Sequence, residues 1–428
     1  MSLLSSPDGD PSGVAKKTAI DKDLKRIVQL DKATTRTGLR NLDMGFGLLF
    51  VMGVWAYTYL QSGTTDGYAV IAIASIIGAY MAMNIGANDV ANNVGPAVGS
   101  KALTMMGALV IAAVFEAAGA LIAGGDVVST ISKGIVSPES FSDQSVFVSA
   151  MLAALLAAAL WVNLATLIGA PVSTTHSIVG GVLGAGIAAA GVSAVDWPIM
   201  GTIAASWVIS PVLGGIVAAG FLLFVKVAVI FKEDKVAAAQ RWIPVLVGIM
   251  AGAFSVYLVM KGLKRVWKPE TPALFAIGIA AFLIGYAIVR FIALKDTSHV
   301  ENNRKSVGQL FRSPLICAAA LLSFAHGSND VANAVGPLAA IVTAVTAGTV
   351  SAKVTLPLWV LAIGAIGISI GLMLFGPKII KIVGEKITKL DPIRAFCVAL
   401  SAAITVIIAS GLGLPVSSTH IAVGGVFG

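Results

Sequence analysis

Two phrases each occur twice in this chain. The first copy reads GANDVANNVGPAVGS at 86–100 and PVSTTHSIVGGVLG at 171–184, and the second reads GSNDVANAVGPLAA at 327–340 and PVSSTHIAVGGVFG at 415–428. The distance from Gly86 to Pro171 is 85 residues, and the distance from Gly327 to Pro415 is 88. Because both phrases and their spacing are kept, the sequence indicates that a whole structural unit is duplicated.

The composition places these repeats in a membrane. Hydrophobic residues make up 57% of the chain and charged residues only 12%, against about 25% charged in a typical soluble protein. Several apolar runs approach the roughly 20 residues that a spanning helix needs, and none has the alternation of an outer-membrane strand. We therefore expect an all-α polytopic membrane protein with about ten to twelve passes. The main runs are 44–60, 68–83, 146–169, 242–260, 273–294, 356–375 and 393–412.

The net charge of +8 is unevenly distributed. Residues 1–43 contain eight Lys or Arg and residues 226–312 contain thirteen, whereas 44–225 contain only Lys101 and Lys133. By the positive-inside rule, both basic regions are expected to be cytoplasmic. Membrane topology explains this pattern better than nucleic-acid binding does.

The repeats and the charges together divide the chain into five parts. We predict a basic cytoplasmic tail at 1–43, a leading transmembrane helix at 44–62, a first repeat at 66–225, central basic helices and a loop at 226–312, and a second repeat at 313–428. Only eight residues follow His420, which predicts an incomplete C-terminal helix. Matching polar phrases beside short or Gly-rich apolar runs favour two inverted repeats with broken or re-entrant helices. The only two cysteines lie in apolar runs, so no disulfide framework is implied.

The first phrase of each copy is rich in oxygen ligands. Such polar side chains are costly in hydrocarbon unless they face one another, water or a ligand. Their carboxylate and amide oxygens suit a small cation, although they could instead cap and connect interrupted helices. The candidate coupling-ion residues are Asn88, Asp89, Asn92, Asn329, Asp330 and Asn333, with Asp89 and Asp330 as the metal ligands if the ion is sodium.

The second phrase of each copy predicts the start of a helix. Proline is favoured there and Ser and Thr are good N-caps, while the free N–H groups of a helix start bind anions. The alternative is a plain helix start with no ligand. The candidate anion-binding residues are Ser173, Thr174, Thr175, Ser417, Ser418 and Thr419. Since neither phrase contains Arg or Lys, a cation bound beside the anion would relieve its repulsion from the carboxylates, and this predicts symport.

Three further residues are candidates for proton transfer or gating. Glu116 is a lone carboxyl group in an apolar run, and its counterpart in the second copy is Ile368. His176 and His420 end the two PVS phrases. Each of the three could instead form a structural hydrogen bond between helices.

Both pairs of phrases, in this order and spacing, resemble those of the inorganic phosphate transporter (PiT) family. The resemblance covers about 85 to 90% of the chain. It implies a symporter with inverted repeats that imports phosphate with sodium or a proton by alternating access, with the Asn/Asp phrases on the ion side and the PVS phrases on the phosphate side. A sulfate permease of the same architecture is the alternative.

The resemblance also bears on partners and location. It implies a transporter and not an enzyme, with no cofactor other than sodium as a coupling ion. Phosphate, the coupling ion and the lipid bilayer are the expected partners, and a homodimer is compatible with the sequence. A bacterial-type cytoplasmic membrane is the expected location, with a chloroplast inner envelope as the alternative.

Overall fold

The structure is a computed structural model that describes residues 42–428 except 263–268, 299, 350–355 and 387–389. The described residues are almost entirely helical, and their one β-bridge joins Val136 to Val195. Ten of their helices are long and apolar enough to span a membrane, which agrees with the predicted range. These are Leu42–Ser62, α2 (Tyr68–Gly99), α3 (Met105–Ala123), α5 (Gln144–Ile168), α7 (Trp197–Val225), α8 (Lys235–Gly262), α9 (Thr271–Ile288), α11 (Arg312–Ala347), α12 (Leu358–Lys386) and α13 (Pro392–Gly411).

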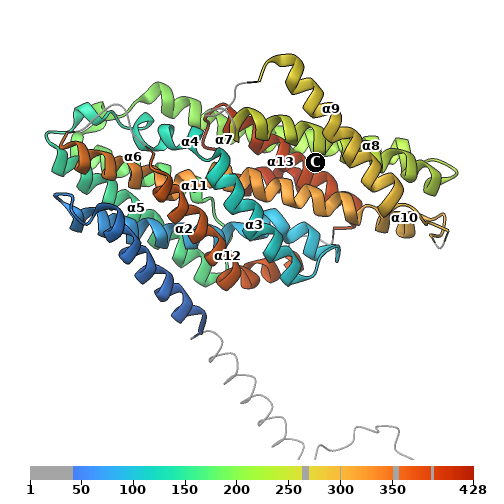
Figure 1. Ribbon diagram of the computed structural model, residues 1–428, viewed down its shortest axis with the longest axis horizontal. Helices are drawn as coiled ribbons and strands as arrows, with labels where there is room; N and C mark the ends of the chain where they lie inside the picture. The colour runs from blue at the N-terminus through green and yellow to red at the C-terminus, as the bar shows by residue number, and fades with distance from the viewer. Residues whose placement is uncertain (1–41, 263–268, 299, 350–355, 387–389) are drawn as a thin grey trace, which may run out of the picture. The chain divides into compact units, whose positions relative to one another are not determined.

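Shorter helices connect or accompany these spans. The second phrase of each copy opens α6 (Thr174–Ala190) or α14 (Ser418–Phe427), and both helices are too short to be counted among the ten. The other α-helices among the described residues are α4 (Gly125–Ser129) and α10 (Arg304–Leu310). Figure 1 shows α2 and α11 in the middle of the bundle, with α8 and α9 packed against each other.

Large apolar side chains cover the outside of the outer helices. On α9, Phe275, Ile279 and Leu283 are 68%, 58% and 56% exposed and recur every four residues, so they form one stripe on the helix. Exposing such a stripe to water would be unfavourable in a soluble protein, whereas lipid is as apolar as these side chains. The protein is therefore an integral membrane protein.

The directions of four helices show that the repeats are inverted. In α2 and α12, Gly367 lies against Ala79 and Ala82, and Gly376 lies against Val90, so residue numbers rise together and the two helices are parallel. By the same test α3 and α11 are parallel, because Gly119 meets Phe324 and Gly124 meets Val331.

The relation between α2 and α11 follows from their own contacts. Gly78 of α2 lies against Ala334 and Leu338 of α11, whereas Asp89 lies beside His326. Numbers rise along one helix as they fall along the other, so α2 and α11 are antiparallel. Because these two helices carry the same phrase, the two copies have opposite orientations in the membrane, as predicted.

Glycines allow the two repeats to interlock. A Cβ atom at Gly86 or Gly371 would overlap backbone atoms across the α2–α12 crossing, and a Cβ at Gly119 or Gly327 would do so across the α3–α11 crossing. Each crossing joins a helix of one repeat to a helix of the other. Gly327 meets Glu116 and Gly86 meets Ile368, so equivalent contacts support the sequence correspondence of Glu116 with Ile368.

One sequence expectation needs correction. The Asn/Asp phrases were expected at interrupted helices, but α2 and α11 are continuous through them and extend for 32 and 36 residues. Most of the polar side chains form hydrogen bonds with neighbouring helices and segments, so the backbone has no need to unwind there. The backbone is non-helical instead just before α6 and α14.

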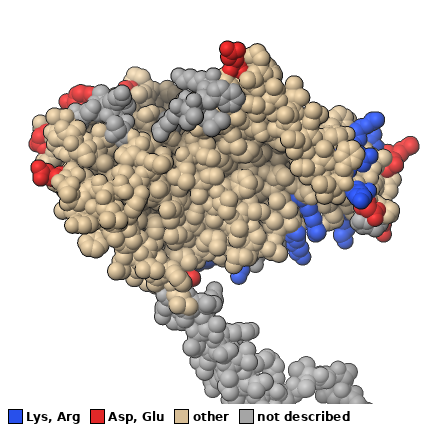
Figure 2. All heavy atoms as spheres, viewed as in Figure 1, with Lys and Arg blue, Asp and Glu red and all other residues tan. Residues whose placement is uncertain are grey.

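Charged side chains lie at the ends of the helices. On the face seen in Figure 2, Lys and Arg gather near α8 and α10, whereas the broad tan surface between the two ends carries few charges. This distribution is the one expected where apolar helix surfaces face lipid and their ends face water.

Candidate functional site

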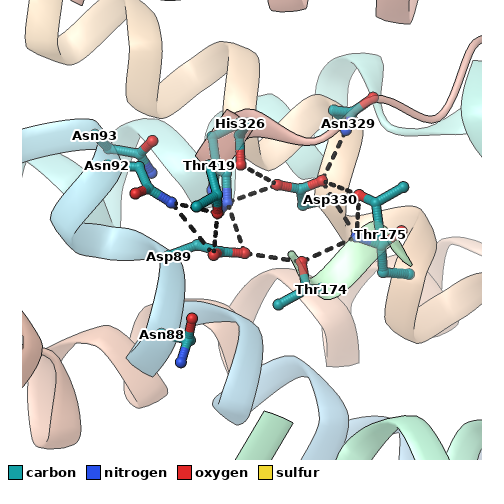
Figure 3. Close-up of polar contacts among 12 residues, drawn as sticks. Asn88, Asp89, Asn92, Asn93, Thr174, Thr175, His326, Asn329, Asp330 and Thr419 are labelled. Carbon is teal, nitrogen blue, oxygen red and sulfur yellow. Dashed lines mark hydrogen bonds and ion pairs between the residues drawn. The ribbon is translucent and has the colours of Figure 1, made fainter. Parts of the chain in front are cut away.

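The two repeated aspartates lie at the centre of one polar cluster, inside the bundle (Figure 3). Asp89 of α2 is 1% exposed and Asp330 of α11 is 0% exposed. Buried carboxylates need hydrogen-bond donors or cations, and hydroxyl groups supply some of these. These hydroxyl groups come from four of the six residues predicted as anion ligands, namely Thr174, Thr175, Ser418 and Thr419. The structure therefore brings the Asn/Asp phrases and the PVS phrases together.

Each aspartate takes one hydroxyl from its own repeat and one from the other. Asp89 accepts hydrogen bonds from Thr174 Oγ1 at 2.8 Å and from Thr419 Oγ1 at 3.2 Å. Asp330 accepts from Ser418 Oγ at 3.0 Å and from Thr175 Oγ1 at 3.2 Å. The two copies therefore form one site with an approximate twofold symmetry.

Two asparagines extend this pattern. Asn92 Nδ2 donates to Thr419 Oγ1 at 2.9 Å and to Asp89 Oδ1 at 3.3 Å. Asn333 Nδ2 donates to Thr175 Oγ1 at 3.1 Å and to Asp330 Oδ1 at 3.2 Å. Each asparagine thus connects the carboxylate of its own helix to the short helix of the opposite repeat.

Asn88 and Asn329 contact the non-helical segments before the short helices. Asn88 Nδ2 donates to Thr166 Oγ1 at 2.9 Å and to Ala170 O at 3.1 Å, while its Oδ1 accepts from Val172 N at 2.9 Å. Asn88 was predicted as a coupling-ion residue, but these hydrogen bonds join it to α5 and to the segment before α6 and not to a carboxylate.

The equivalent Asn329 divides its contacts between the segment and the aspartate. Its Nδ2 donates to Val416 O at 3.0 Å and to Asp330 Oδ1 at 2.7 Å, and its Oδ1 accepts from Ser410 Oγ at 3.3 Å. Asn88 and Asn329 hold the chain that leads into α6 and α14.

Both predicted helix starts are confirmed. Ser173 caps α6 by accepting from His176 N at 3.1 Å, and Ser417 caps α14 by accepting from His420 N at 3.2 Å. Their hydroxyl groups therefore serve the helices. In the described part of the chain, the first two N–H groups of each helix have no protein acceptor, as expected for a helix start.

These free N–H groups lie beside the carboxylate cluster. They belong to Thr174 and Thr175 in α6 and to Ser418 and Thr419 in α14, the residues whose side chains contact the aspartates. Two positive helix ends therefore converge on one buried place, a favourable environment for an anion.

His176 and His420 lie next to each other beside the two helix starts. Their ring centres are 4.7 Å apart, and the ring of His176 packs at 3.8 Å against Trp207. The Trp207 Nε1–H donates to Pro415 O at 3.2 Å. Neither histidine is among the residues that the structure places in hydrogen bonds or ion pairs with the aspartates.

His326, which was not predicted from the sequence, also lies in the cluster. Its Nε2 lies 2.7 Å from Asp330 Oδ2 and 3.6 Å from Asp89 Oδ2, and its Nδ1 lies 3.0 Å from Glu116 Oε2. The Nε2 contacts are at ion-pair distance without hydrogen-bond alignment. A signal was present, because His326 precedes Asp330 by one helical turn, but its counterpart in the first copy is Ile85.

Several oxygen atoms of this cluster could bind a cation. One ligand atom from each of Asp89, His326 and Asp330 lies within 4.8 Å of the others. Among the described residues, the buried Oδ1 atoms of Asn93 and Asn333 have no hydrogen-bond partner. Carboxylate and amide oxygens are hard ligands that suit alkali or other hard cations. The site can therefore hold a cation next to the helix starts that favour an anion.

A family model described as "Phosphate transporter family" matches residues 85–428, which include all four phrases and the whole cluster. The chain belongs to this family. A solved structure titled "The sodium-dependent phosphate transporter" is similar to the chain, with a TM-score of 0.79 and 39% identity over 83% of this chain and 88% of the other.

Two further proteins are similar to the chain over most of their length. A Helicobacter pylori protein assigned as a phosphate permease is 52% identical over 95% of this chain and 77% of its own length. A Pyrococcus abyssi protein with the same assignment is 40% identical over 84% of this chain and 88% of its own length.

Proposed function

We propose that this chain is a secondary active symporter that imports inorganic phosphate together with sodium. The observation that carries the proposal is the pairing of Asp89 with Thr419 and of Asp330 with Thr175. Through these bonds, two carboxylates and two helix starts from inverted repeats form a single buried site. A site shared between inverted repeats is the arrangement that alternating access uses.

The helix starts are the proposed phosphate site. Phosphate carries several acceptor oxygens, which match the free N–H groups and the hydroxyls at the starts of α6 and α14. No Lys or Arg side chain is among the described partners of Asp89 and Asp330. Ser173 and Ser417 support this site through the helix caps that they form.

The carboxylates are the proposed cation site. Two ionised carboxylates would repel a phosphate anion bound beside them, and a cation between them removes this repulsion. Each ion then increases the affinity for the other, which is the thermodynamic basis of coupling. Asp89, Asp330, Asn92 and Asn333 would bind the cation, while Asn88 and Asn329 would hold the segments that carry the anion site.

Sodium is preferred to a proton as the coupling ion. Hard oxygen atoms dominate the cluster, and the similar solved structure is titled a sodium-dependent transporter. Coupling to a proton is the alternative. Phosphate uptake at one fixed pH, with and without a sodium gradient, distinguishes the two coupling ions. The cytoplasmic membrane of a bacterium is the proposed location, because the H. pylori relative is bacterial. The homodimer remains a prediction from the sequence.

Substrate identity is tested with purified protein in liposomes. Uptake of radiolabelled phosphate is measured alone, with unlabelled sulfate, and with the same concentration of unlabelled phosphate. The proposal predicts concentrative phosphate uptake that sulfate hardly reduces. Stronger competition by sulfate than by unlabelled phosphate would instead identify a sulfate permease.

A further inference from the structure

An apolar groove lies between α7 and α8. It has a volume of about 460 Å³ and is lined by residues between 217 and 224 on α7 and between 242 and 249 on α8, none of them charged. The lining positions recur every three or four residues, so one face of each helix forms a wall. Ile249 in one wall is 55% exposed, which means that the groove opens to the surroundings of the bundle. Its occupant must therefore be apolar along the walls.

One end of the groove lies beside the turn that joins the two helices. Phe224 and Trp242, the lining residues nearest this turn, pack edge to face with ring centres 5.0 Å apart. Asn302 holds the turn, because it accepts from Lys235 N at 2.8 Å and donates to Glu233 O at 2.7 Å. The segment that contains Asn302 leads into α10, where Lys and Arg gather (Figure 2). By the positive-inside rule, this end of the groove faces the cytoplasm.

Two hydrogen-bond donors lie at the same end. Arg241 is exposed and precedes the wall residue Val245 by one helical turn, and Trp242 carries an indole N–H. Among the described residues, neither the Arg241 guanidinium nor this N–H takes part in a hydrogen bond or an ion pair. Since α8 begins at Lys235, Arg241 lies about 9 Å along the helix, close to the depth at which headgroups meet hydrocarbon.

The lysines of the turn are less available than Arg241. Lys232 and Lys235 flank Glu233 and Asp234, whose charges offset theirs, and Lys235 Nζ donates to Lys232 O at 3.0 Å. Arg241 is therefore the cation that the groove presents at its cytoplasmic end.

We propose that the groove binds an acyl chain of an anionic phospholipid from the cytoplasmic leaflet, and that Arg241 and the Trp242 N–H bind its phosphate. A guanidinium group matches the oxygen atoms of a phosphate, and tryptophan is enriched where hydrocarbon meets headgroups. An anionic phospholipid satisfies both parts of the site. Free phosphate would leave the walls uncovered, and a neutral hydrocarbon would leave Arg241 unpaired.

A helix of another subunit fits the groove less well than an acyl chain does. A helix with its side chains is about 10–12 Å across, and each wall of eight residues is only about 12 Å long, so a helix would contact the groove at one crossing point. An extended acyl chain follows the walls along their full length. The lipid site does not depend on the proposed transport function, because none of its lining residues belongs to the polar cluster.

Two variants test the two parts of the site separately. Gly220→Leu fills the groove, which Gly220 lines. A Cβ atom at Gly220 meets no atom within 4 Å, and leucine is a better helix former than glycine, so this variant should fold. Arg241→Gln removes the positive charge and leaves the walls intact.

Each variant has a matched control. Gly201→Leu makes the same change in α7, again with no atom within 4 Å of the Cβ, but outside the groove. Lys305→Gln removes one exposed positive charge from α10 on the same side of the membrane. Both controls should respond to lipid as the wild type does.

The experiment follows the melting temperature of the purified full chain in detergent against the mole fraction of added lipid, because a bound ligand raises the melting temperature. Phosphatidylglycerol is compared with phosphatidylcholine of identical acyl chains, and saturating inorganic phosphate is present throughout, so that the proposed phosphate site is already occupied. The choline cation repels Arg241, so phosphatidylglycerol should half-saturate at a mole fraction about fivefold lower or more. Arg241→Gln should remove this difference. Gly220→Leu should raise both values about tenfold or more, because several methylene groups lose their contacts.

Three results would overturn the proposal. Equal half-saturation by the two lipids in the wild type would show that the groove selects no anionic headgroup. Equal effects of Gly220→Leu and Gly201→Leu would show that lipid binds elsewhere. A changed molar mass of Gly220→Leu in size-exclusion chromatography with light scattering, with an unchanged response to lipid, would identify the groove as a contact between subunits.

Native mass spectrometry gives a second readout that needs no change in stability. The wild type and Lys305→Gln should each retain a phosphatidylglycerol molecule that Arg241→Gln loses. Equal retention by all three proteins would contradict the role of Arg241.

Discussion

At the scale of single residues, Asp89 and Asp330 have nearly equivalent surroundings. Each is buried, and each is bonded to one hydroxyl from its own repeat and one from the other. Amide groups of Asn92, Asn329 and Asn333 add further donors, but neutral donors alone do not offset the cost of burying two ionised carboxylates. A cation bound between them would offset it, and this defines the first prediction.

Replacing either carboxylate should weaken the dependence on sodium. In Asp89→Asn and Asp330→Asn the side chain keeps its shape and loses its charge, so we expect the apparent KM for sodium in phosphate uptake to rise about tenfold or more, the range of a charged hydrogen bond. Sodium titrations of uptake provide the measurement. Asp143→Asn is the control, because Asp143 is exposed and caps α5. Unchanged sodium dependence in both variants would contradict the assignment.

Removing a hydroxyl at a helix start should weaken phosphate binding. Thr175→Val and Thr419→Val keep the volume of the side chain and remove one donor each, so the apparent KM for phosphate should rise about two- to tenfold, the range of a neutral hydrogen bond. The control is Thr202→Val, since this exposed hydroxyl bonds only to its own helix, at Pro198 O. Equal effects of all three variants would argue against a phosphate site at α6 and α14.

At the scale of elements, the site depends on how closely α2 approaches α12. The glycines Gly86 and Gly371 bring the backbones together, and the same helices carry the ion-binding phrase into the centre. Close backbone contact through small residues is a common way to pack helices in lipid. Any side chain at these glycines must push the helices apart.

We therefore predict that Gly86→Ala and Gly371→Ala destabilise the folded protein. Overpacking typically costs about 1–3 kcal/mol, and here the obstacle is backbone, which cannot rotate away. The yield of monodisperse protein in size-exclusion chromatography and its melting temperature provide the measurements. Gly184→Ala in α6 is the control, because a Cβ there meets no atom within 4 Å. A melting temperature of Gly86→Ala equal to that of the wild type would contradict the close backbone contact between α2 and α12.

Much of the site could be predicted at this scale, but only where the signal was local. The caps at Ser173 and Ser417 follow from a proline and hydroxyl residues within one short phrase. The bonds from Thr419 to Asp89 and from Thr175 to Asp330 join residues 330 and 155 positions apart, and no periodicity reports such a pairing. Asn88 is next to Asp89 in the sequence, yet its amide bonds to the non-helical segment before α6 instead of to a carboxylate.

His326 shows a different limit of the sequence. The duplicated phrases identify residues that the two copies share. His326 and Glu116 are not shared, because Ile85 and Ile368 stand at the equivalent positions. Only the crossing of α3 with α11 shows that these two differences are in contact. The duplicated phrases therefore locate the site, and the unmatched residues show how its halves became unequal.

At the scale of the whole molecule, the inverted repeats fix which helix ends share a side of the membrane. Because α2 and α11 are antiparallel, the residues just before them lie on opposite sides. Arg312 is the first residue of α11, and Arg304 lies shortly before it. The positive-inside rule therefore places this end of α11 in the cytoplasm. The end of α2 that follows Asp66 then faces outward.

Site-directed labelling tests this topology. Single cysteines are placed at Asp66 and at Lys305 after Cys317 and Cys397 are replaced by serine. In intact cells, a membrane-impermeant maleimide should label Asp66→Cys but not Lys305→Cys, and both should react after the membrane is opened. Labelling of both positions, or of neither, in intact cells would contradict the inverted arrangement.

Sodium-driven accumulation of phosphate tests the central claim most directly. Proteoliposomes at one fixed pH inside and outside receive radiolabelled phosphate, with an inward sodium gradient, with equal sodium on both sides, or with potassium in place of sodium. The sodium gradient alone should drive phosphate transiently above its external concentration, and Asp89→Asn with Asp330→Asn should abolish this overshoot. Accumulation that needs no sodium, or uptake that stops at equilibrium under every gradient, would contradict a sodium–phosphate symporter.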